Sequence, residues 1–259
     1  MNWNSIMGVV SSVALLLPII FILVFRISGF RSFPVLLIYY SSIFIYNLLT
    51  EGYIKTNHDV VHYWGLINNL LDAPLILLFL TYLSTSKKFT SGIIMIIAAF
   101  VLFEILVVSL AGLNTDSVTI ILGPGLLLVF GVCLFYFIRL AKLIVEHKKF
   151  TGRALIASSL LFAYGCYGII YLIYYILKSH INNGVINQQH VADTFLVYFF
   201  ASTFSSIMMS IGLIFESKRI HKLFELKITR KELSTIYTET KRAAPLRTAM
   251  LDFDKNHWN

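Results

Sequence analysis

The chain has 259 residues, of which 58% are hydrophobic and 13% are charged, and its formal net charge is +8. A soluble domain would carry about a quarter charged residues, so the composition argues against an ordinary soluble protein. Apolar runs of the length needed to cross a bilayer recur along the whole chain, and they predict transmembrane helices.

The apolar runs predict an all-α, polytopic membrane protein with seven transmembrane helices. The first run lacks a basic n-region and a small-residue cleavage site, so we interpret it as a retained span rather than a signal peptide. The predicted helices cover residues 5–27, 33–54, 63–84, 92–113, 117–142, 153–177 and 193–215.

Two domains are predicted, a seven-helix transmembrane bundle over 1–215 and a basic cytoplasmic tail over 216–259. The tail is expected to hold short amphipathic helices. Its apolar residues Ile220, Leu223 and Phe224 suit a short helix that lies on the inner leaflet. Thr229 and Glu232 form the pattern of a capping box, with Thr229 as the N-cap, and this pattern predicts the start of a new helix.

Basic residues indicate the orientation, because they resist translocation across the membrane. Nine lie in the connections after the first, third and fifth helices and ten in the tail, which places 19 of the 21 on one side. Lys55 and Lys178 lie on the other side. We therefore expect the N-terminus outside and the C-terminus in the cytoplasm. The net charge then reflects topology and an anionic inner leaflet, and no nucleic-acid partner is expected.

The third predicted helix carries polar residues in a stretch otherwise suited to lipid. The segment "WGLINNLLDAPLILLFLTYL" at 64–83 contains Asn68, Asn69 and Asp72. At about 1.5 Å of rise per residue, Asp72 lies roughly 12 Å below the outer end of its helix, and Glu104 on the fourth helix lies at a similar depth. A carboxylate within a bilayer is costly, so such residues usually face the bundle interior and mark function.

Other helices place polar or irregular features in the same outer half of the membrane. The fifth helix has a Gly-Pro-Gly sequence at 123–125 that predicts a kink. The sixth carries tyrosines at spacings of three and four, which share one face. The predicted pocket combines the polar residues at this depth: Asn47, Asn68, Asp72, Glu104, Tyr164, Tyr167, Tyr171 and Ser202. The alternative is that these groups are structural and bond to one another across helices.

The segment "NNLLDAPLILL" resembles the third helix of microbial rhodopsins, where a polar counterion position precedes a proline-containing run. By this resemblance Asn68 falls at the counterion position, and "FAYG" at 162–165 is similar to the aromatic pocket segment of the sixth helix. The resemblance implies a rhodopsin-like bundle. Retinal in that family is held by a Schiff base to a lysine of the seventh helix, and "TFLVYFFASTFSSIMMSIGLIF" contains no lysine. No retinal or other cofactor is therefore expected.

Two further classes remain open. Seven-helix intramembrane hydrolases of the ceramidase type use a zinc site with histidines. Here His58 and His62 are four residues apart, but they and the later His180 and His190 lie in predicted outer loops, so no metal site and no enzyme is predicted. A channel or transporter would use Asp72 and Glu104 as an ion relay, although the chain shows no internal repeat.

We therefore expect a receptor-like or sensory protein of a bacterial inner (plasma) membrane, with an outward-facing polar pocket. Its tail is too short for an enzymatic output domain, so signalling would require a separate cytoplasmic partner. The alternative is an ion, proton or small-solute translocator that uses Asp72 and Glu104. Small residues on the seventh helix, among them Ser202, Ser206 and Gly212, offer a face for close helix contact inside the bundle or in a homo-oligomer.

Overall fold

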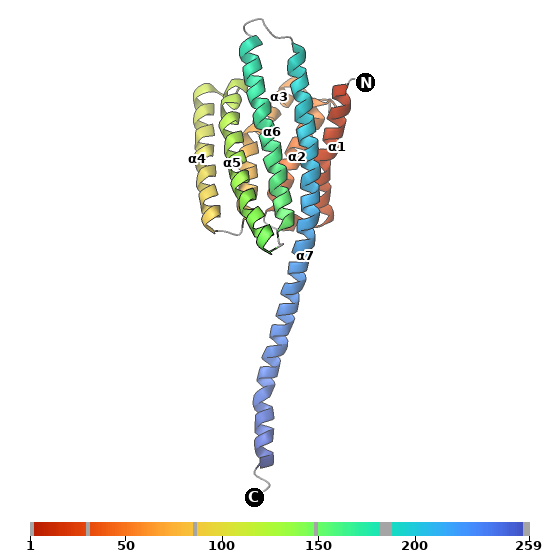
Figure 1. The fold of residues 1–259 in the computed structure, drawn as a ribbon, viewed down its shortest axis with the longest axis vertical. Coiled ribbons are helices and arrows are strands. Elements are labelled where there is room, and N and C mark those ends of the chain that lie inside the picture. Colours follow the sequence, from red (N-terminus) through yellow and green to blue (C-terminus); the bar gives the residue numbers. More distant parts are fainter. Residues whose placement is uncertain (1–2, 30–31, 85–86, 148–149, 182–187, 256–259) are drawn as a thin grey trace. The chain divides into compact units, whose positions relative to one another are not determined.

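The structure, a computed structural model, describes residues 3–29, 32–84, 87–147, 150–181 and 188–255, and the elements in these ranges are all helical. Figure 1 shows their order in the chain. The elements are α1 (Trp3–Val24), the 3-10 turn η1 (Ile27–Gly29), α2 (Phe33–Thr50), α3 (His58–Leu83), α4 (Lys87–Ala111), α5 (Thr115–His147), α6 (Thr151–Ile181) and α7 (Gln188–Lys255).

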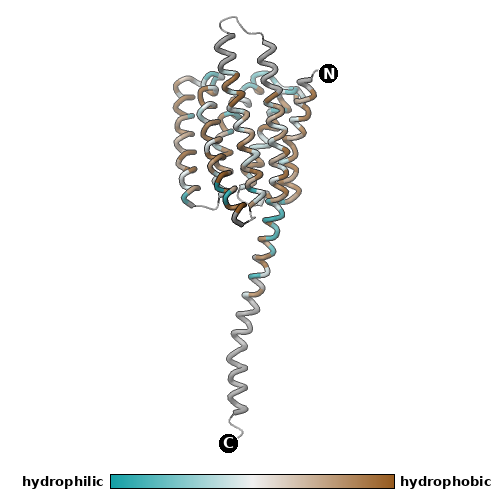
Figure 2. Tube along the Cα trace, in the orientation of Figure 1, coloured by the Kyte–Doolittle hydropathy of each residue, from teal (hydrophilic) through white to brown (hydrophobic). Residues whose placement is uncertain are grey.

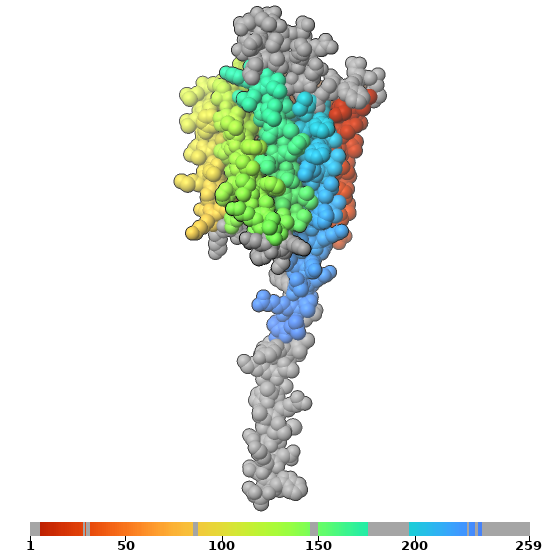
Figure 3. All heavy atoms as spheres, in the orientation of Figure 1, coloured from red at the N-terminus to blue at the C-terminus, as the bar shows by residue number. Residues whose placement is uncertain are grey.

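Seven of these helices are long and apolar enough to cross a membrane, as the sequence predicts. Their outward side chains are also apolar: Met95 is 77% exposed, Leu127 is 74% exposed and Leu110 is 86% exposed. Such side chains would be unfavourable in water but are at no disadvantage against lipid tails. Figure 2 shows that the coloured parts of the bundle helices are largely hydrophobic. Figure 3 shows one outer face of the same helices with all heavy atoms drawn. The chain is therefore a multi-pass membrane protein.

Helix α3 lies at the centre of the packing, in contact with α2, α4 and α5. Its second half is buried on several sides, and Ile76, Leu77, Phe79 and Leu80 have no exposed surface. Helix α4 packs against α3 and α5 and lies at one edge of the bundle (Figure 1). Asp72 stands on α3 one turn before the fully buried Ile76 and Leu77, which places this carboxylate where several helices meet.

Helices α6 and α7 approach each other closely through small residues. The hydroxyl of Ser205 on α7 donates a hydrogen bond to the carbonyl of Ser159 on α6 at 3.1 Å. A Cβ added to Gly212 would lie 3.0 Å from the backbone nitrogen of Ile156, so only glycine fits at this crossing. The buried Ser206 lies on the same stretch of α7. The small residues of the seventh helix thus face the inside of the bundle.

The chain divides into two compact units, Met1–Glu216 and Ser217–Asn259. The second unit differs from the expected short helices, because α7 is assigned as one continuous helix as far as Lys255. Residues 216–255 contain no glycine, the residue that most often ends a helix. Thr229 is not a helix start: it lies inside α7, where its hydroxyl donates to the carbonyl of Glu225 at 3.0 Å.

Candidate functional site

Asp72 is held by a tyrosine from a helix distant in the sequence. The hydroxyl of Tyr164 on α6 donates to Oδ2 of Asp72 on α3 at 2.8 Å. The hydroxyl of Tyr39 on α2 lies 3.4 Å from the hydroxyl of Tyr164. Both tyrosines are buried, with exposed fractions of 6% for Tyr39 and 1% for Tyr164. One carboxylate thus joins α3 to α6, and α2 lies within reach of the same group.

A cavity of about 390 Å³ lies beside Asp72 and has walls from α2, α3, α5, α6 and α7. Helix α3 contributes three polar side chains: Asn68, Asn69 and Asp72. Five tyrosines also line the cavity: Tyr39, Tyr167, Tyr171, Tyr174 and Tyr198. Most of the other lining residues are aliphatic. This combination of a largely apolar wall with a few convergent polar groups is typical of small-molecule sites, which measure about 300–1,000 Å³.

The tyrosines of α6 reach the cavity because their spacing keeps them on one face of the helix. The rings of Tyr164 and Tyr167 meet edge to face at 5.9 Å between centroids. Tyr167 in turn stacks on Tyr198 of α7 at 5.2 Å. One turn further along, the hydroxyl of Tyr171 donates to the carbonyl of Thr119 on α5 at 3.0 Å. These contacts fix the aromatic wall between α5 and α7.

The Gly-Pro-Gly sequence of α5 makes room for this wall. A Cβ on Gly123 would lie 3.0 Å from the hydroxyl oxygen of Tyr171, and a Cβ on Gly125 would lie 3.0 Å from the ring of Phe100 on α4. Pro124 lies between the two glycines, inside a helix that runs from Thr115 to His147 without interruption. The glycines therefore let α5 approach its neighbours closely. Pro124 has no backbone N–H, so one backbone hydrogen bond of the helix is missing at the same place.

The structure places five of the eight predicted site residues at or beside this cavity. Four of them line the cavity: Asn68, Asp72, Tyr167 and Tyr171. Tyr164 is the hydrogen-bond donor to Asp72. Asn68 is further positioned by Ser42 of α2, whose hydroxyl donates to its Oδ1 at 2.7 Å. These five residues come from α3 and α6, which are well separated in the sequence.

The other three predicted residues lie elsewhere. The amide of Asn47 donates to Ser12 on α1 at 3.1 Å, and Ser202 on α7 bonds to Ser11 on α1 at 2.8 Å. These two residues connect α1 to its neighbours. Glu104 is 8% exposed and does not line the cavity, and its Oε1 has no hydrogen-bond partner among the described residues. A similar depth in the membrane therefore does not bring Glu104 into the same cluster, because depth leaves the direction of each side chain around its helix open.

Among the asparagines and tyrosines that line the cavity, four were not predicted: Tyr39, Asn69, Tyr174 and Tyr198. Tyr198 lies one turn before Ser202 on the same helix. The prediction therefore selected the correct helix for the pocket but the wrong residue on it. Tyr39 is part of a tyrosine pair near the middle of α2, directly before Ser41 and Ser42. A mid-membrane tyrosine is weak evidence by itself, since aromatic residues also pack in cores without any other role.

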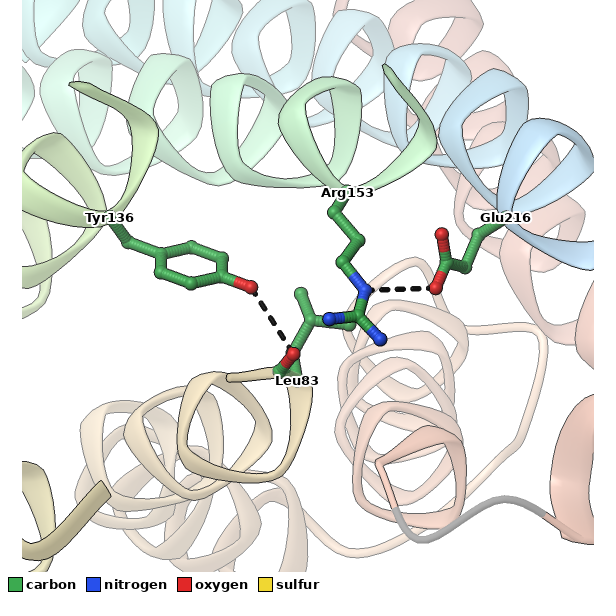
Figure 4. Close-up of polar contacts among 4 residues, drawn as sticks. All are labelled: Leu83, Tyr136, Arg153 and Glu216. Carbon is green, nitrogen blue, oxygen red and sulfur yellow. Dashed lines mark hydrogen bonds and ion pairs between the residues drawn. The ribbon is translucent and has the colours of Figure 1, made fainter. Parts of the chain in front are cut away.

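The opposite end of the bundle, where α6 begins, holds a buried ion pair (Figure 4). Nε of Arg153 on α6 lies 3.0 Å from Oε1 of Glu216 on α7, and the Glu216 side chain is 1% exposed. A Cβ on Gly152 would lie 2.6 Å from the backbone nitrogen of Glu216, so the helices touch here. Nearby, the hydroxyl of Tyr136 on α5 donates to the carbonyl of Leu83, the last residue of α3, at 3.2 Å.

Among the described residues, no group of three or more His, Cys, Asp or Glu side chains is placed to hold a metal ion. The side chains of His180 and His190, considered with His58 and His62 for a surface site, lie outside the described residues. No family model, no curated protein and no solved structure matches this chain.

Proposed function

We propose that this protein is a receptor-like membrane protein that binds a small molecule in the cavity beside Asp72. The observation that carries the proposal is the cavity itself, in which one carboxylate, two amides and five tyrosines converge from different helices. Residues that serve only to pack helices would fill this space. No catalytic group is assigned to the site.

The proposal takes the orientation from the distribution of basic residues, with the N-terminus outside the cell membrane of a bacterium. Thr115, the first residue of α5, and Tyr174, in the last part of α6, both line the cavity. The cavity therefore lies toward the end of the bundle at which α1 begins (Figure 1). In the proposed orientation this end faces outward, so the ligand arrives from the external medium or from the outer leaflet.

Helix α6 is the proposed link between the cavity and the cytoplasmic side. It carries Tyr164 at the cavity and Arg153 eleven residues earlier, which is about 16 Å along the helix. A ligand that takes the hydrogen bond of Asp72 from Tyr164 removes a contact that holds α6 to α3. The change then reaches the Arg153–Glu216 pair (Figure 4), from which α7 leads toward the tail and a cytoplasmic partner.

The alternative of an ion or solute translocator has less support. It requires Asp72 and Glu104 to act as a relay, and no hydrogen bond or ion pair of the described residues joins the two. The half of α3 that follows Asp72 toward the other side is packed without exposed surface at Ile76, Leu77 and Leu80. A hydrated path beside this helix would have to separate these contacts.

Hydrogen exchange on the purified protein tests the proposal. Asp72→Asn removes the charge that Tyr164 binds, and Glu104→Gln is the matched control, a carboxylate outside the cavity. We expect Asp72→Asn to change amide exchange at 150–156 and 210–216, where α6 meets α7, and Glu104→Gln to leave these segments unchanged. Proteoliposomes should show no proton or sodium flux above empty vesicles. Unchanged exchange at the junction, together with a flux that Asp72→Asn abolishes, would favour the translocator instead.

A further inference from the structure

We infer that the cavity beside Asp72 selects an organic cation, a substituted ammonium ion whose charge is held by Asp72 and whose alkyl groups lie against the tyrosines. The inference rests on the proposed function, because it names the chemical class of the ligand that the cavity would bind.

The charge of the lining residues supports a cation. Asp72 is the one charged side chain among the described residues that line the cavity. Within the part of the chain that the structure describes, Asp72 forms no ion pair with a lysine, arginine or histidine. The hydroxyl of Tyr164 donates to Oδ2, but a neutral donor does not cancel a full negative charge. A carboxylate among apolar helices is stabilised strongly by a positive partner, because attraction between charges is stronger where water is scarce.

The aromatic wall supports an organic rather than an inorganic cation. Five tyrosines line the cavity, and the stack of Tyr167 on Tyr198 holds two of the rings in place. Ammonium groups bind to the faces of aromatic rings, and aromatic cages are a known means of recognising quaternary ammonium ions. A metal cation would instead require six or more oxygen ligands for calcium, or an octahedral set for magnesium, and the cavity offers one carboxylate and two amides.

Other ligand classes fit the cavity less well. An anion would meet Asp72 with no lysine, arginine or histidine in the described wall to compensate the repulsion. A neutral polar molecule would leave the charge of Asp72 without a partner. Asn68 and Asn69 lie about one turn before Asp72 on α3 and provide amide groups for a hydroxyl or carbonyl group of the ligand. The geometry therefore favours a molecule with one ammonium group, an apolar body and few polar atoms.

Binding of defined ammonium ions to the full-length protein tests the inference. The probes are choline, tetraethylammonium, benzyltrimethylammonium and phenethylamine, measured by calorimetry with the protein in bilayer discs of phosphatidylglycerol. This lipid avoids the choline and ethanolamine headgroups, which are themselves substituted ammonium ions. The decisive control for choline is 3,3-dimethylbutan-1-ol, which has the same shape with carbon in place of the charged nitrogen.

We expect at least one ammonium probe to bind, and choline to bind about tenfold more tightly than its neutral isostere. Asp72→Asn should weaken binding of the best probe by about tenfold or more, and Glu104→Gln should leave it within about twofold. Tyr198→Leu, which removes an aromatic face from the wall of the cavity, should bind the best probe more weakly. Size-exclusion chromatography establishes whether each variant is folded. If Asp72→Asn does not fold, the comparison of choline with its neutral isostere on the wild-type protein is the deciding test.

Three outcomes would overturn the inference: no ammonium probe binds, the neutral isostere binds as tightly as choline, or Asp72→Asn and Glu104→Gln have the same effect. The proposed function fails separately. Binding of a probe that depends on Asp72, without any change of amide exchange at the α6–α7 junction, would leave the cation site standing and refute the receptor mechanism.

Discussion

Replacing Gly152 by alanine should destabilise the bundle, and the structure sets the size of the effect. The added Cβ would lie 2.6 Å from the backbone nitrogen and 3.0 Å from the Cα of Glu216, so α6 and α7 must move apart as whole helices. Overpacking of this kind costs about 1–3 kcal/mol. Gly152 is the second residue of α6, so the helical preference of alanine, worth roughly 0.5–1 kcal/mol in the middle of a helix, offsets only a small part of it. We therefore expect a net loss on the order of 1–2 kcal/mol.

Gly168→Ala is the matched control on the same helix. A Cβ at Gly168 would meet nothing within 4 Å, so this variant keeps the propensity gain without the clash and should be more stable than the wild type by about 0.5–1 kcal/mol. The assay heats the detergent-solubilised protein, tagged with a fluorescent protein, and finds the temperature at which half of the monodisperse chromatographic peak is lost. The two variants should shift in opposite directions. Equal stability of Gly152→Ala and wild type would refute the close contact of α6 and α7.

Three further predictions follow from the topology, the ion pair and the tyrosine of the site. In intact cells, a label that cannot cross membranes should not react with a tag at Asn259 but should react with one inserted in the 181–190 loop; the reverse pattern would overturn the orientation. Glu216→Ala should destabilise the bundle by about 2 kcal/mol or more in the thermal assay, because it leaves a partly buried arginine without its partner. The double variant with methionine at Arg153 and Glu216 should regain much of this loss, and a double variant no better than the single one would contradict that reasoning. Tyr164→Phe should cost about 1–3 kcal/mol because it removes a donor from a buried carboxylate, and an unchanged midpoint would show that this hydrogen bond contributes little.

The seven-helix architecture was predictable from local sequence. A bilayer imposes one length and one polarity on every spanning segment, so each helix can be recognised without knowing its neighbours. The extent of α7 was not predictable in the same way. Beyond Glu216 the chain lacks a strong apolar period, and both the capping pattern at Thr229 and the proline at position 245 indicate helix boundaries, whereas α7 runs through both positions to Lys255.

The same distinction between local sequence and tertiary packing applies to the candidate site. Helix rise places Asp72 and Glu104 at similar depths, and spacing places the tyrosines of α6 on one face, because depth and face are properties of a single helix. The partners of these residues depend on how each helix is rotated about its axis and on which helix lies beside it. These are set by packing between segments far apart in the sequence. Tyr164 therefore meets Asp72 across 92 positions, whereas Glu104, at a similar predicted depth, remains outside the cavity.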